Sequence, residues 1–414
     1  MRRQLILLVF GCCVPAFAAA TPPQNSVRPE IRTMTKLRET DGTFARWIAD
    51  FRLRAQAAGI SQSTLAEALA GIRYNAEVID LDRSQAEFVK PIWTYLDSAV
   101  SETRVSNGRA ALRDNAGILA SVEARFSVEK EIVAAIWGLE SAYGAVRGST
   151  PVIEAMATLA HDGRRGAFFE DQLIAALRIL DRGDTTPSAM RGSWAGAMGH
   201  TQFIPTSYLA YAEDFDGDGK SDIWGEDPAD ALASTAGYLK AHGWTFGQPW
   251  GLEVTIPEGW DYARADRRVA ALPSAWAAEG ITAADGTPIP DYAPASILLP
   301  AGAEGAAFMI FPNFEVLEAY NTADAYVIGV GHLADRIAGA GPLAAEWPRA
   351  DRPLGPEDRI ELQRLLTAAG FSTRGIDGKI GPNTINAIRA YQQANELVPD
   401  GYASSRLLDR LQVN

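Results

Sequence analysis

The chain has 414 residues, of which 47% are hydrophobic and 21% charged, so it has the composition of a globular protein with room for two or three domains. Its net charge of −13 and the lack of long Lys and Arg runs argue against nucleic acid as a partner and against binding to anionic membranes through a general electrostatic field. No two of the four histidines have metal-ligand spacing, which argues against a zinc site.

Residues 1–20 are predicted to be a secretory signal peptide. Arg2 and Arg3 precede the apolar run Leu5–Val14, which is too short to span a membrane, and small residues follow it. We therefore expect an exported, periplasmic protein.

Both cysteines, Cys12 and Cys13, fall in this leader, so the mature protein is expected to contain no cysteine. The alternative is a lipoprotein anchored through Cys12 or Cys13. We regard it as the weaker interpretation, because Phe10 stands where such leaders have small residues.

The next segment, residues 21–40, is polar and contains several prolines, which predicts a disordered lead-in. Helical periodicity dominates from Phe44 onward, and residues 41–340 are interpreted as one mostly helical domain. Turn signals such as Asn107-Gly108 separate its first helices. The predicted helices span 44–58, 61–70, 90–108, 109–125, 127–144 and 166–182.

The most informative helix is predicted between Ser127, its N-cap, and Gly144, which ends it. Four apolar residues form one stripe at helical spacing, and Glu140 lies at the edge of this stripe in the last turn. A carboxyl group that is half buried among apolar side chains should have a raised pKa, which suits a general acid at neutral pH. The alternative is a helix-ending Glu that forms a salt bridge. The stripe consists of Ile132, Ile136, Leu139 and Tyr143.

Glycines and aromatic residues alternate in residues 191–208. Glycines at this density let the backbone approach a ligand closely, and the aromatic rings would offer it a flat surface. Ser193 and Gln202 could orient that ligand. The alternative is a tightly packed turn between helices.

The acidic segment Asp214–Asp222 has the spacing of an EF-hand loop. Asp occupies positions 1, 3, 5 and 9, Gly occupies position 6, and Lys220 occupies position 7, where only the backbone carbonyl is needed. We expect a structural calcium ion here, and the alternative is a solvated acidic turn. Position 12 is Gly225 instead of Glu, so the last ligand must come from Glu226, Asp227 or Asp230.

The remainder of the chain changes character twice. Residues 245–311 are rich in proline and glycine and contain alternating apolar segments, which predicts a small β-containing subdomain between the helices 230–242 and 313–331. The proline-rich residues 341–356 are predicted to form a semi-rigid linker. A repeated Asp-Gly turn then predicts a small helical module at 357–414. Its predicted core consists of Leu362, Leu365, Leu366, Ile388 and Tyr391.

A single buried Glu, a floor of glycines and aromatics, export and an appended module fit an enzyme that acts on an extracytoplasmic polysaccharide. Glycoside hydrolases usually need two carboxylates, but no candidate near Glu140 has a comparably apolar setting. We therefore favour a mechanism in which Glu140 first protonates the glycosidic oxygen and then, as carboxylate, deprotonates a nucleophile supplied by the substrate. The candidates for a second carboxylate were Glu154, Asp162, Glu170 and Asp171.

Several ordered motifs resemble the lytic murein transglycosylases of the membrane-bound B type, a lysozyme-like family. They are GLESAYG around Glu140, GSWAGAMGHTQFIPTSY from Gly192, DFDGDGKSDIW from Asp214 and KAHGW from Lys240. Further on, LQRLLTAAGF and DGKIGPNTINAIRAYQ resemble the three-helix peptidoglycan-binding module often fused to such enzymes. The resemblance implies a mainly α (α+β) fold: a lysozyme-like helical catalytic domain with a small β-containing insertion, an EF-hand-like loop and a three-helix C-terminal module.

The resemblance also implies a reaction on the glycan strands of peptidoglycan. The β-1,4 bond between N-acetylmuramic acid and N-acetylglucosamine is cleaved without water, because the muramoyl C6 hydroxyl attacks C1 and leaves a 1,6-anhydromuramoyl end. No cofactor is implied for this chemistry, only the structural calcium ion. Other cell-wall enzymes are possible partners that the sequence does not name.

The motif positions imply roles for individual residues. Glu140 matches the catalytic acid/base, and Arg164 and Arg165 match a basic pair near the peptide-bearing groove. Phe203 is a weaker candidate for stacking on a sugar. The implied polar and hydroxyl contacts are Ser193, Gln202, Tyr238, Tyr320 and Tyr326. The implied calcium ligands are Asp214, Asp216, Asp218, the carbonyl of Lys220, and Asp230, although a shifted spacing near Gly225 leaves the last ligand open.

Structural alternatives stand beside these roles. Ser193 could cap a turn, Gln202 could bond backbone, and Tyr238 could serve packing. The arginine pair could be a solvated face. For the whole chain, the alternatives are a non-catalytic wall-binding or scaffolding protein and a muramidase hydrolase on the same fold.

Overall fold

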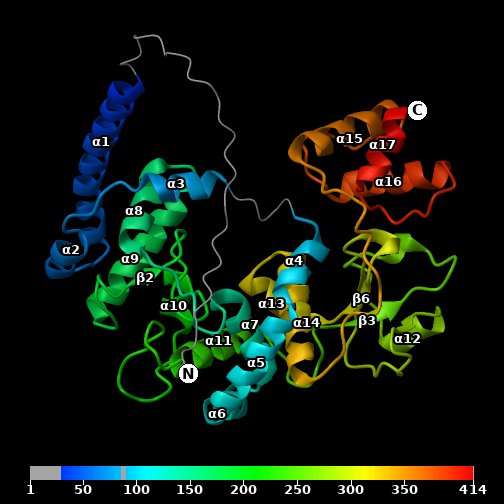
Figure 1. The fold of residues 1–414 in the computed structure, drawn as a ribbon, viewed down its shortest axis with the longest axis horizontal. Helices are drawn as coiled ribbons and strands as arrows, with labels where there is room; N and C mark the ends of the chain where they lie inside the picture. The colour runs from blue at the N-terminus through cyan, green and yellow to red at the C-terminus, as the bar shows by residue number, and fades with distance from the viewer. Residues whose placement is uncertain (1–28, 85–89, 414) are drawn as a thin grey trace, which may run out of the picture.

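The computed structural model describes residues 29–84 and 90–413. The predicted signal peptide, with Cys12 and Cys13, lies outside these residues, as do residues 21–28 of the predicted lead-in. Helices predominate in the described part and strands are short, which confirms the predicted mainly α (α+β) fold (Figure 1). None of the helices described is both long enough and apolar enough to cross a membrane.

Most helices share one hydrophobic core. At its centre α14 packs against α4, α5 and α7, while α8 and α9 form a pair that α1, α2, α3 and α10 surround. These helices are α1 (Pro29–Ala57), α2 (Gln62–Ala68), α3 (Ala76–Arg83), α4 (Ile92–Ala99), α5 (Glu102–Asp114), α6 (Ala116–Phe126), α7 (Lys130–Ser141), α8 (Val152–Asp162), α9 (Gly166–Arg182), α10 (Pro205–Tyr211), α11 (Ala229–Ala241), α13 (Pro312–Tyr320) and α14 (Asp324–Ala338).

The helix α1 begins earlier than predicted. Residues 29–40, which we expected to belong to a disordered lead-in, are helical. Lys, Arg, Leu and Glu, which all favour helix, are frequent in this stretch and outweigh its polarity. Pro29 is the first helical residue, where its missing N–H costs nothing.

Two predicted helix boundaries were wrong. Residues 90–125 form three helices, not two, because Ser101 caps the N-terminus of α5 and Asn115 separates α5 from α6. Gly108, predicted to lie in a turn, is inside α5, and the side chains of Tyr143 and Ile337 occupy the place of its absent Cβ. This glycine therefore serves close packing.

The predicted β-containing insertion is confirmed as a four-stranded antiparallel sheet in the order β4-β3-β6-β5, with its own core around Trp276. In Figure 1 this subdomain lies beside α14. It consists of β3 (Gly251–Thr255), α12 (Pro273–Ala278), β4 (Thr282–Ala283), β5 (Ser296–Leu298) and β6 (Ala307–Ile310). A second, two-stranded sheet pairs β1 (Thr150–Pro151) with β2 (Arg191–Gly192).

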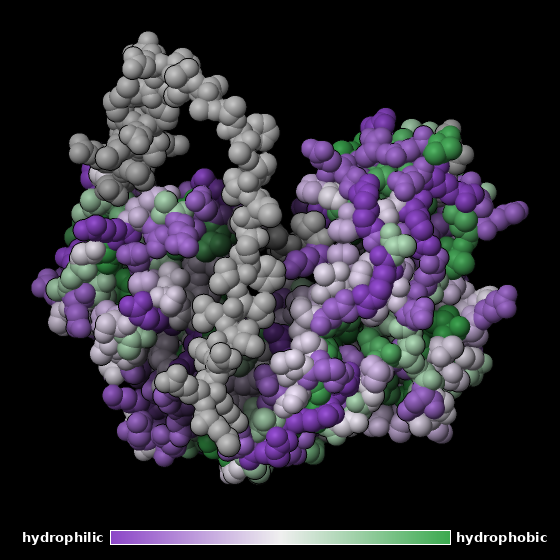
Figure 2. Space-filling model, in the orientation of Figure 1, coloured by the Kyte–Doolittle hydropathy of each residue, from purple (hydrophilic) through white to green (hydrophobic). Residues whose placement is uncertain are grey.

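The C-terminal module contains three helices, α15 (Pro356–Ala368), α16 (Pro382–Ala394) and α17 (Ser405–Val413), and stands next to the sheet (Figure 1). Of its predicted core, Leu362, Leu366, Ile388 and Tyr391 are buried and Leu365 packs against them. Hydrophilic residues predominate on the molecular face in Figure 2, where apolar patches are separate.

Candidate active site

The helix α7 carries Glu140 through the centre of the molecule. All residues from Ile132 to Gly138 are buried, so this part of the helix is buried around its whole circumference. The apolar stripe predicted from the sequence is therefore only one of its buried faces. Glu140 is in the last turn, as predicted. Ser127, predicted as the N-cap, instead ends α6 in a left-handed conformation, and Glu129 is the N-cap residue of α7.

The carboxyl group of Glu140 lies next to two tyrosines from distant parts of the chain. The hydroxyl of Tyr326 on α14 donates a hydrogen bond of 2.5 Å to Oε1 of Glu140. Burial raises the pKa of Glu140 to about 7, although the bond from Tyr326 favours the ionised form. Burial, and after it the charge of Glu140, raises the pKa of Tyr320, whose hydroxyl donates to the carbonyl of Thr201 over 2.6 Å.

Three of the four carboxylates considered as a second catalytic group are bound to other side chains. Glu154 accepts a hydrogen bond from the Asn75 amide. Ion pairs bind Asp162 to Arg83 and Glu170 to Arg54. The fourth candidate, Asp171, is exposed.

Tyr238 and Phe203 lie behind the two tyrosines of the site. Phe203 is 3% exposed, and its ring centre lies 5.9 Å from that of Tyr238 and 6.0 Å from that of Tyr320. The hydroxyl of Tyr238 donates to the carbonyl of Ala319, and its ring stacks on His242 with the centres 4.1 Å apart. In these contacts both residues serve packing.

The glycine-rich segment folds back on itself through backbone contacts. Oγ of Ser193 accepts a hydrogen bond from the amide of Ala197, so Ser193 caps a turn. Gln202 has a φ of 56°, and its Nε2 donates to the carbonyls of Arg147 and Gly199. Oε1 of Gln202 has no hydrogen-bond partner among the described residues, which leaves an acceptor for a ligand.

Arg164 and Arg165 both bind one buried carboxylate, that of Asp82 on α3. Nε of Arg164 lies 2.7 Å from Asp82 Oδ2, and Arg165 lies 3.2 Å from Oδ1. The two guanidinium groups hold the Asp82 pKa below its usual value. The pair thus ties α3 to the connection between α8 and α9, while about half of each arginine side chain stays exposed.

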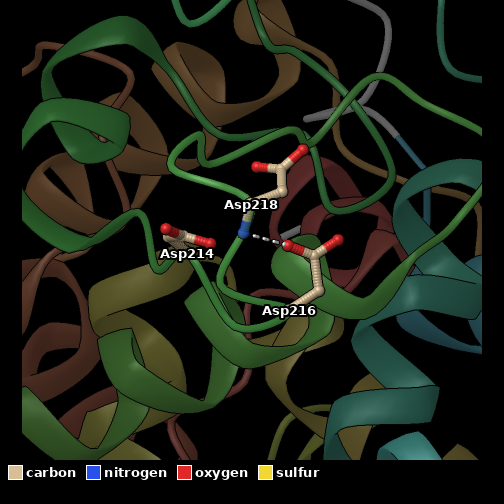
Figure 3. A group of neighbouring side chains, drawn as sticks. All are labelled: Asp214, Asp216 and Asp218. Carbon is tan, nitrogen blue, oxygen red and sulfur yellow. Dashed lines mark hydrogen bonds between the residues drawn. The ribbon is translucent and has the colours of Figure 1, made fainter.

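The acidic segment is a loop in which Asp214, Asp216 and Asp218 each offer an oxygen within 4.8 Å of the others (Figure 3). All three are exposed, as a cation site on a surface loop requires. Gly219, at position 6, has a φ of 92°, which residues other than glycine rarely adopt. The donor set and its geometry therefore fit calcium, which is bound by carboxylate and carbonyl oxygens.

Asp230 lies beside this loop, not within the group of three. It is buried, and its two carboxylate oxygens accept hydrogen bonds from the amides of Phe215, Asp216 and Asp222. These bonds hold the loop against α11.

Two residues that the sequence did not single out, Arg147 and His200, join the end of α7 to residues 223–226. Neither has a neighbour in the sequence that would reveal this connection. Its only sequence signal is the presence of His200 within the glycine-rich motif.

The model of the family described as the transglycosylase SLT domain matches residues 43–335, which is more than half of the chain. The chain belongs to this family. This match confirms the predicted resemblance. A second family model, described as a putative peptidoglycan binding domain, matches residues 355–411.

Named relatives agree with this assignment. The membrane-bound lytic murein transglycosylase B of Escherichia coli (strain K12) is 34% identical over 220 residues, which are 51% of this chain and 58% of that relative. The match thus spans less than two thirds of the relative's length.

Solved structures extend the similarity. SltB3 from Pseudomonas aeruginosa, in complex with NAG-anhNAM-pentapeptide, is 49% identical and has a TM-score of 0.86, covering 89% of this chain and 99% of that chain. The Escherichia coli lytic transglycosylase Slt35, in complex with calcium, is 29% identical with a TM-score of 0.61, covering 72% of this chain and 93% of that one.

Proposed function

We propose that this protein is an exported lytic transglycosylase of peptidoglycan. The observation that carries the proposal is the carboxyl group of Glu140, desolvated at the end of α7 and hydrogen-bonded by Tyr326, with a pKa raised to about 7. Such a group is protonated in part at neutral pH and can both give and accept a proton. The family match and the murein-cleaving relative support the same reaction.

The proposed reaction uses Glu140 twice. Its proton passes to the glycosidic oxygen between N-acetylmuramic acid and N-acetylglucosamine as the bond to C1 breaks. The carboxylate then accepts the proton of the muramoyl C6 hydroxyl, whose oxygen forms a new bond to C1. Glu140 is protonated again, no water is consumed, and the product ends in a 1,6-anhydromuramoyl residue.

We assign the sugar contacts to Tyr320, Tyr326, Ser193 and the free amide oxygen of Gln202. Phe203 and Tyr238 support these residues from behind, and their packing supports this indirect role. The exposed edges of Arg164 and Arg165 are assigned to the peptide-bearing groove.

We further propose a calcium ion in the acidic loop and a wall-binding role for the module. Asp214, Asp216, Asp218 and the carbonyl of Lys220 would hold the ion, with Asp230 as the candidate for the last ligand. The ion would hold the loop together, and the proposed reaction has no step that needs it. Delivery to the periplasm follows from the predicted signal peptide, and a lipid anchor through Cys12 or Cys13 is the alternative.

Digestion of purified sacculi tests the proposed function. The wild-type protein should release soluble muropeptides, and Glu140→Gln, which keeps the shape but cannot exchange the proton, should release at least about 1,000-fold less. Mass spectrometry should find ends lighter by one water than those of a hydrolase. Hydrated ends would establish a muramidase, and a wild-type protein without any release would establish a non-catalytic wall-binding protein.

A further inference from the structure

The chain directly after Glu140 has an unusual backbone. Ala142, Tyr143 and Gly144 have consecutive left-handed φ values of 51°, 60° and 86°. Each non-glycine residue in this conformation costs on the order of 1 kcal/mol, so the surrounding contacts must hold it in place. Because this turn begins two residues after Glu140, whatever holds it also holds the end of α7.

Ser141 and His200 hold the turn from inside. Oγ of Ser141 donates to the carbonyl of His200 over 2.5 Å and accepts from the amide of Gly144 over 2.9 Å. The imidazole of His200 lies where a side chain on Gly144 would be, so only glycine leaves room for it. The strained turn and His200 are therefore built for each other.

The side chain of His200 continues this contact in two directions. Trp137 on α7 can only donate through its Nε1, which lies 3.1 Å from Nδ1 of His200, so Nδ1 is the acceptor. Nε2 consequently carries the proton and donates to the carbonyl of Gly225 over 2.8 Å. The guanidinium of Arg147, which can also only donate, lies 3.2 Å from Nε2 and makes its hydrogen bonds to carbonyl oxygens instead. His200 is 3% exposed, and burial lowers its pKa, in keeping with a neutral ring.

Arg147 makes a second connection to the same segment. Its guanidinium donates to the carbonyls of Trp224 and Gly225 and pairs with Glu226 at 2.7 Å. Its own carbonyl accepts from Nε2 of Gln202. Arg147 thus joins the glycine-rich segment to residues 223–226, which directly follow the acidic loop.

We propose that His200 and Arg147 are positioning residues for Glu140. They form a bridge, defined here as these two side chains and the carbonyl of Gly225, that fixes the strained end of α7 against the segment after the acidic loop. The inference rests on the proposed function, since it takes Glu140 as the acid/base. A positioning residue acts on the reacting geometry, so its loss lowers kcat more than it changes KM.

Two substitutions at His200 distinguish a role of its hydrogen bond to Gly225 from a role in packing alone. In His200→Asn, the amide oxygen takes the place of Nδ1 and keeps the bond from Trp137, but residue 200 no longer donates to Gly225. In His200→Gln, the amide nitrogen takes the place of Nε2 and donates to Gly225, while the bond from Trp137 is lost. Both variants keep the backbone contacts of residue 200.

The experiment measures kcat and KM on soluble glycan strands, together with thermal unfolding. We expect His200→Asn to lose about tenfold in kcat with KM changed by less than about twofold, and His200→Gln to keep at least about three times more kcat than the Asn variant. Equal losses in the two variants, or an effect confined to KM, would overturn the proposal.

Arg147→Gln provides an independent arm, because its side chain is partly exposed and its loss leaves the core intact. It should lower kcat about tenfold, whereas the matched control Arg54→Gln, which breaks the pair with Glu170 on another surface, should stay within about twofold of wild type. Unchanged kcat in Arg147→Gln would contradict the bridge. If Glu140→Gln stayed active, the proposed function would fail instead, so the two failures are distinct.

Discussion

Two opposing influences set the protonation of Glu140. Burial favours the neutral carboxyl group, whereas the hydroxyl of Tyr326 stabilises the carboxylate. The balance at a pKa of about 7 means that protonated and ionised forms coexist near neutral pH. Changing the tyrosine should therefore move the pH range of activity.

Tyr326→Phe should shift the alkaline limb of the pH profile upward. The proposed first step needs protonated Glu140, so kcat/KM should fall as pH rises through the pKa of Glu140. Removing the hydrogen bond that favours the carboxylate raises this pKa further, and we expect the limb to move up by about 0.5–1 pH unit. The measurement is kcat/KM on soluble glycan between about pH 5 and 9.

A matched control for this profile is Tyr262→Phe, which removes a phenol hydroxyl in the β-containing subdomain. The alkaline limb of the pH profile of this variant should coincide with that of the wild type. A limb that moves downward in Tyr326→Phe would show that Tyr326 does not stabilise the Glu140 carboxylate.

The local sequence pattern predicts Glu140, whereas Tyr326 was named only through the family resemblance and its bond to Glu140 was not predicted. The apolar spacing around Glu140 is local, so helical geometry alone places the carboxyl at a buried edge. Tyr326 lies 186 positions away, and only the packing of α14 on α7 brings the two together. Ser193 and Gln202 were identified by type, yet their backbone bonds depend on the path of the glycine-rich segment.

Among the elements, α5 and α7 form a slot for one aromatic ring. The phenol of Tyr143 lies between Gly108 of α5 and Gly138 of α7, and its hydroxyl donates to the carbonyl of Arg104. A Cβ on either glycine would overlap the phenol. The absence of a side chain at these two glycine positions thus leaves room for the ring between the helices.

Gly138→Ala should destabilise the protein by about 1–3 kcal/mol, because the added methyl overpacks the slot. In a Tyr143→Ala background the same change should instead be neutral or stabilise by up to about 1 kcal/mol, since alanine favours helix over glycine. Urea unfolding of the four proteins in this double-mutant cycle measures the coupling. An equal cost in both backgrounds would contradict the slot.

The proposed calcium ion in the acidic loop can be tested by removing the metal and measuring thermal stability. If calcium neutralises the grouped carboxylates, a chelator should lower the melting temperature of the wild type by several degrees. Asp218→Ala should lose most of this sensitivity, whereas Asp171→Ala, which removes an exposed carboxylate elsewhere, should keep it. A wild type whose melting temperature ignores the chelator would refute the calcium proposal.

Helix existence was easier to predict than helix ends. The periodic segments around α7, α9 and α11 are helical, but Ser127 and Gly108 were assigned to the wrong local roles. A Ser can cap the helix that follows it or end the helix before it in a left-handed conformation, as Ser127 does. Tertiary contacts decide such cases, and a local pattern does not contain them.

At the scale of the whole molecule, the module is docked on the β-containing subdomain. Arg406 pairs with Glu304 of this subdomain at 2.9 Å and also with the buried Asp351 of the preceding segment at 2.7 Å. The carboxylate of Asp400 accepts from the amide of Ala303 over 2.9 Å. The repeat predicted the module's helices and core, but these contacts depend on surfaces that no repeat encodes.

Deleting residues 355–414 should weaken binding to sacculi by about tenfold or more, because the wall contact of the module no longer raises the local concentration. Turnover of short soluble glycans should stay within about twofold, since Glu140 and its neighbours are intact. Pull-down with sacculi and kinetics on the same preparations test both parts. Equal pull-down of the full-length and truncated proteins would refute a binding role.

The segment before the module is anchored along its length. The two carboxylate oxygens of Glu253 on β3 accept hydrogen bonds from the amides of Ala344 and Ala345. Arg349 forms an ion pair with Asp97 on α4 at 2.8 Å. If the module binds the wall as proposed, a pull on it would therefore load the contacts with β3 and α4 before it reached α14 along the chain.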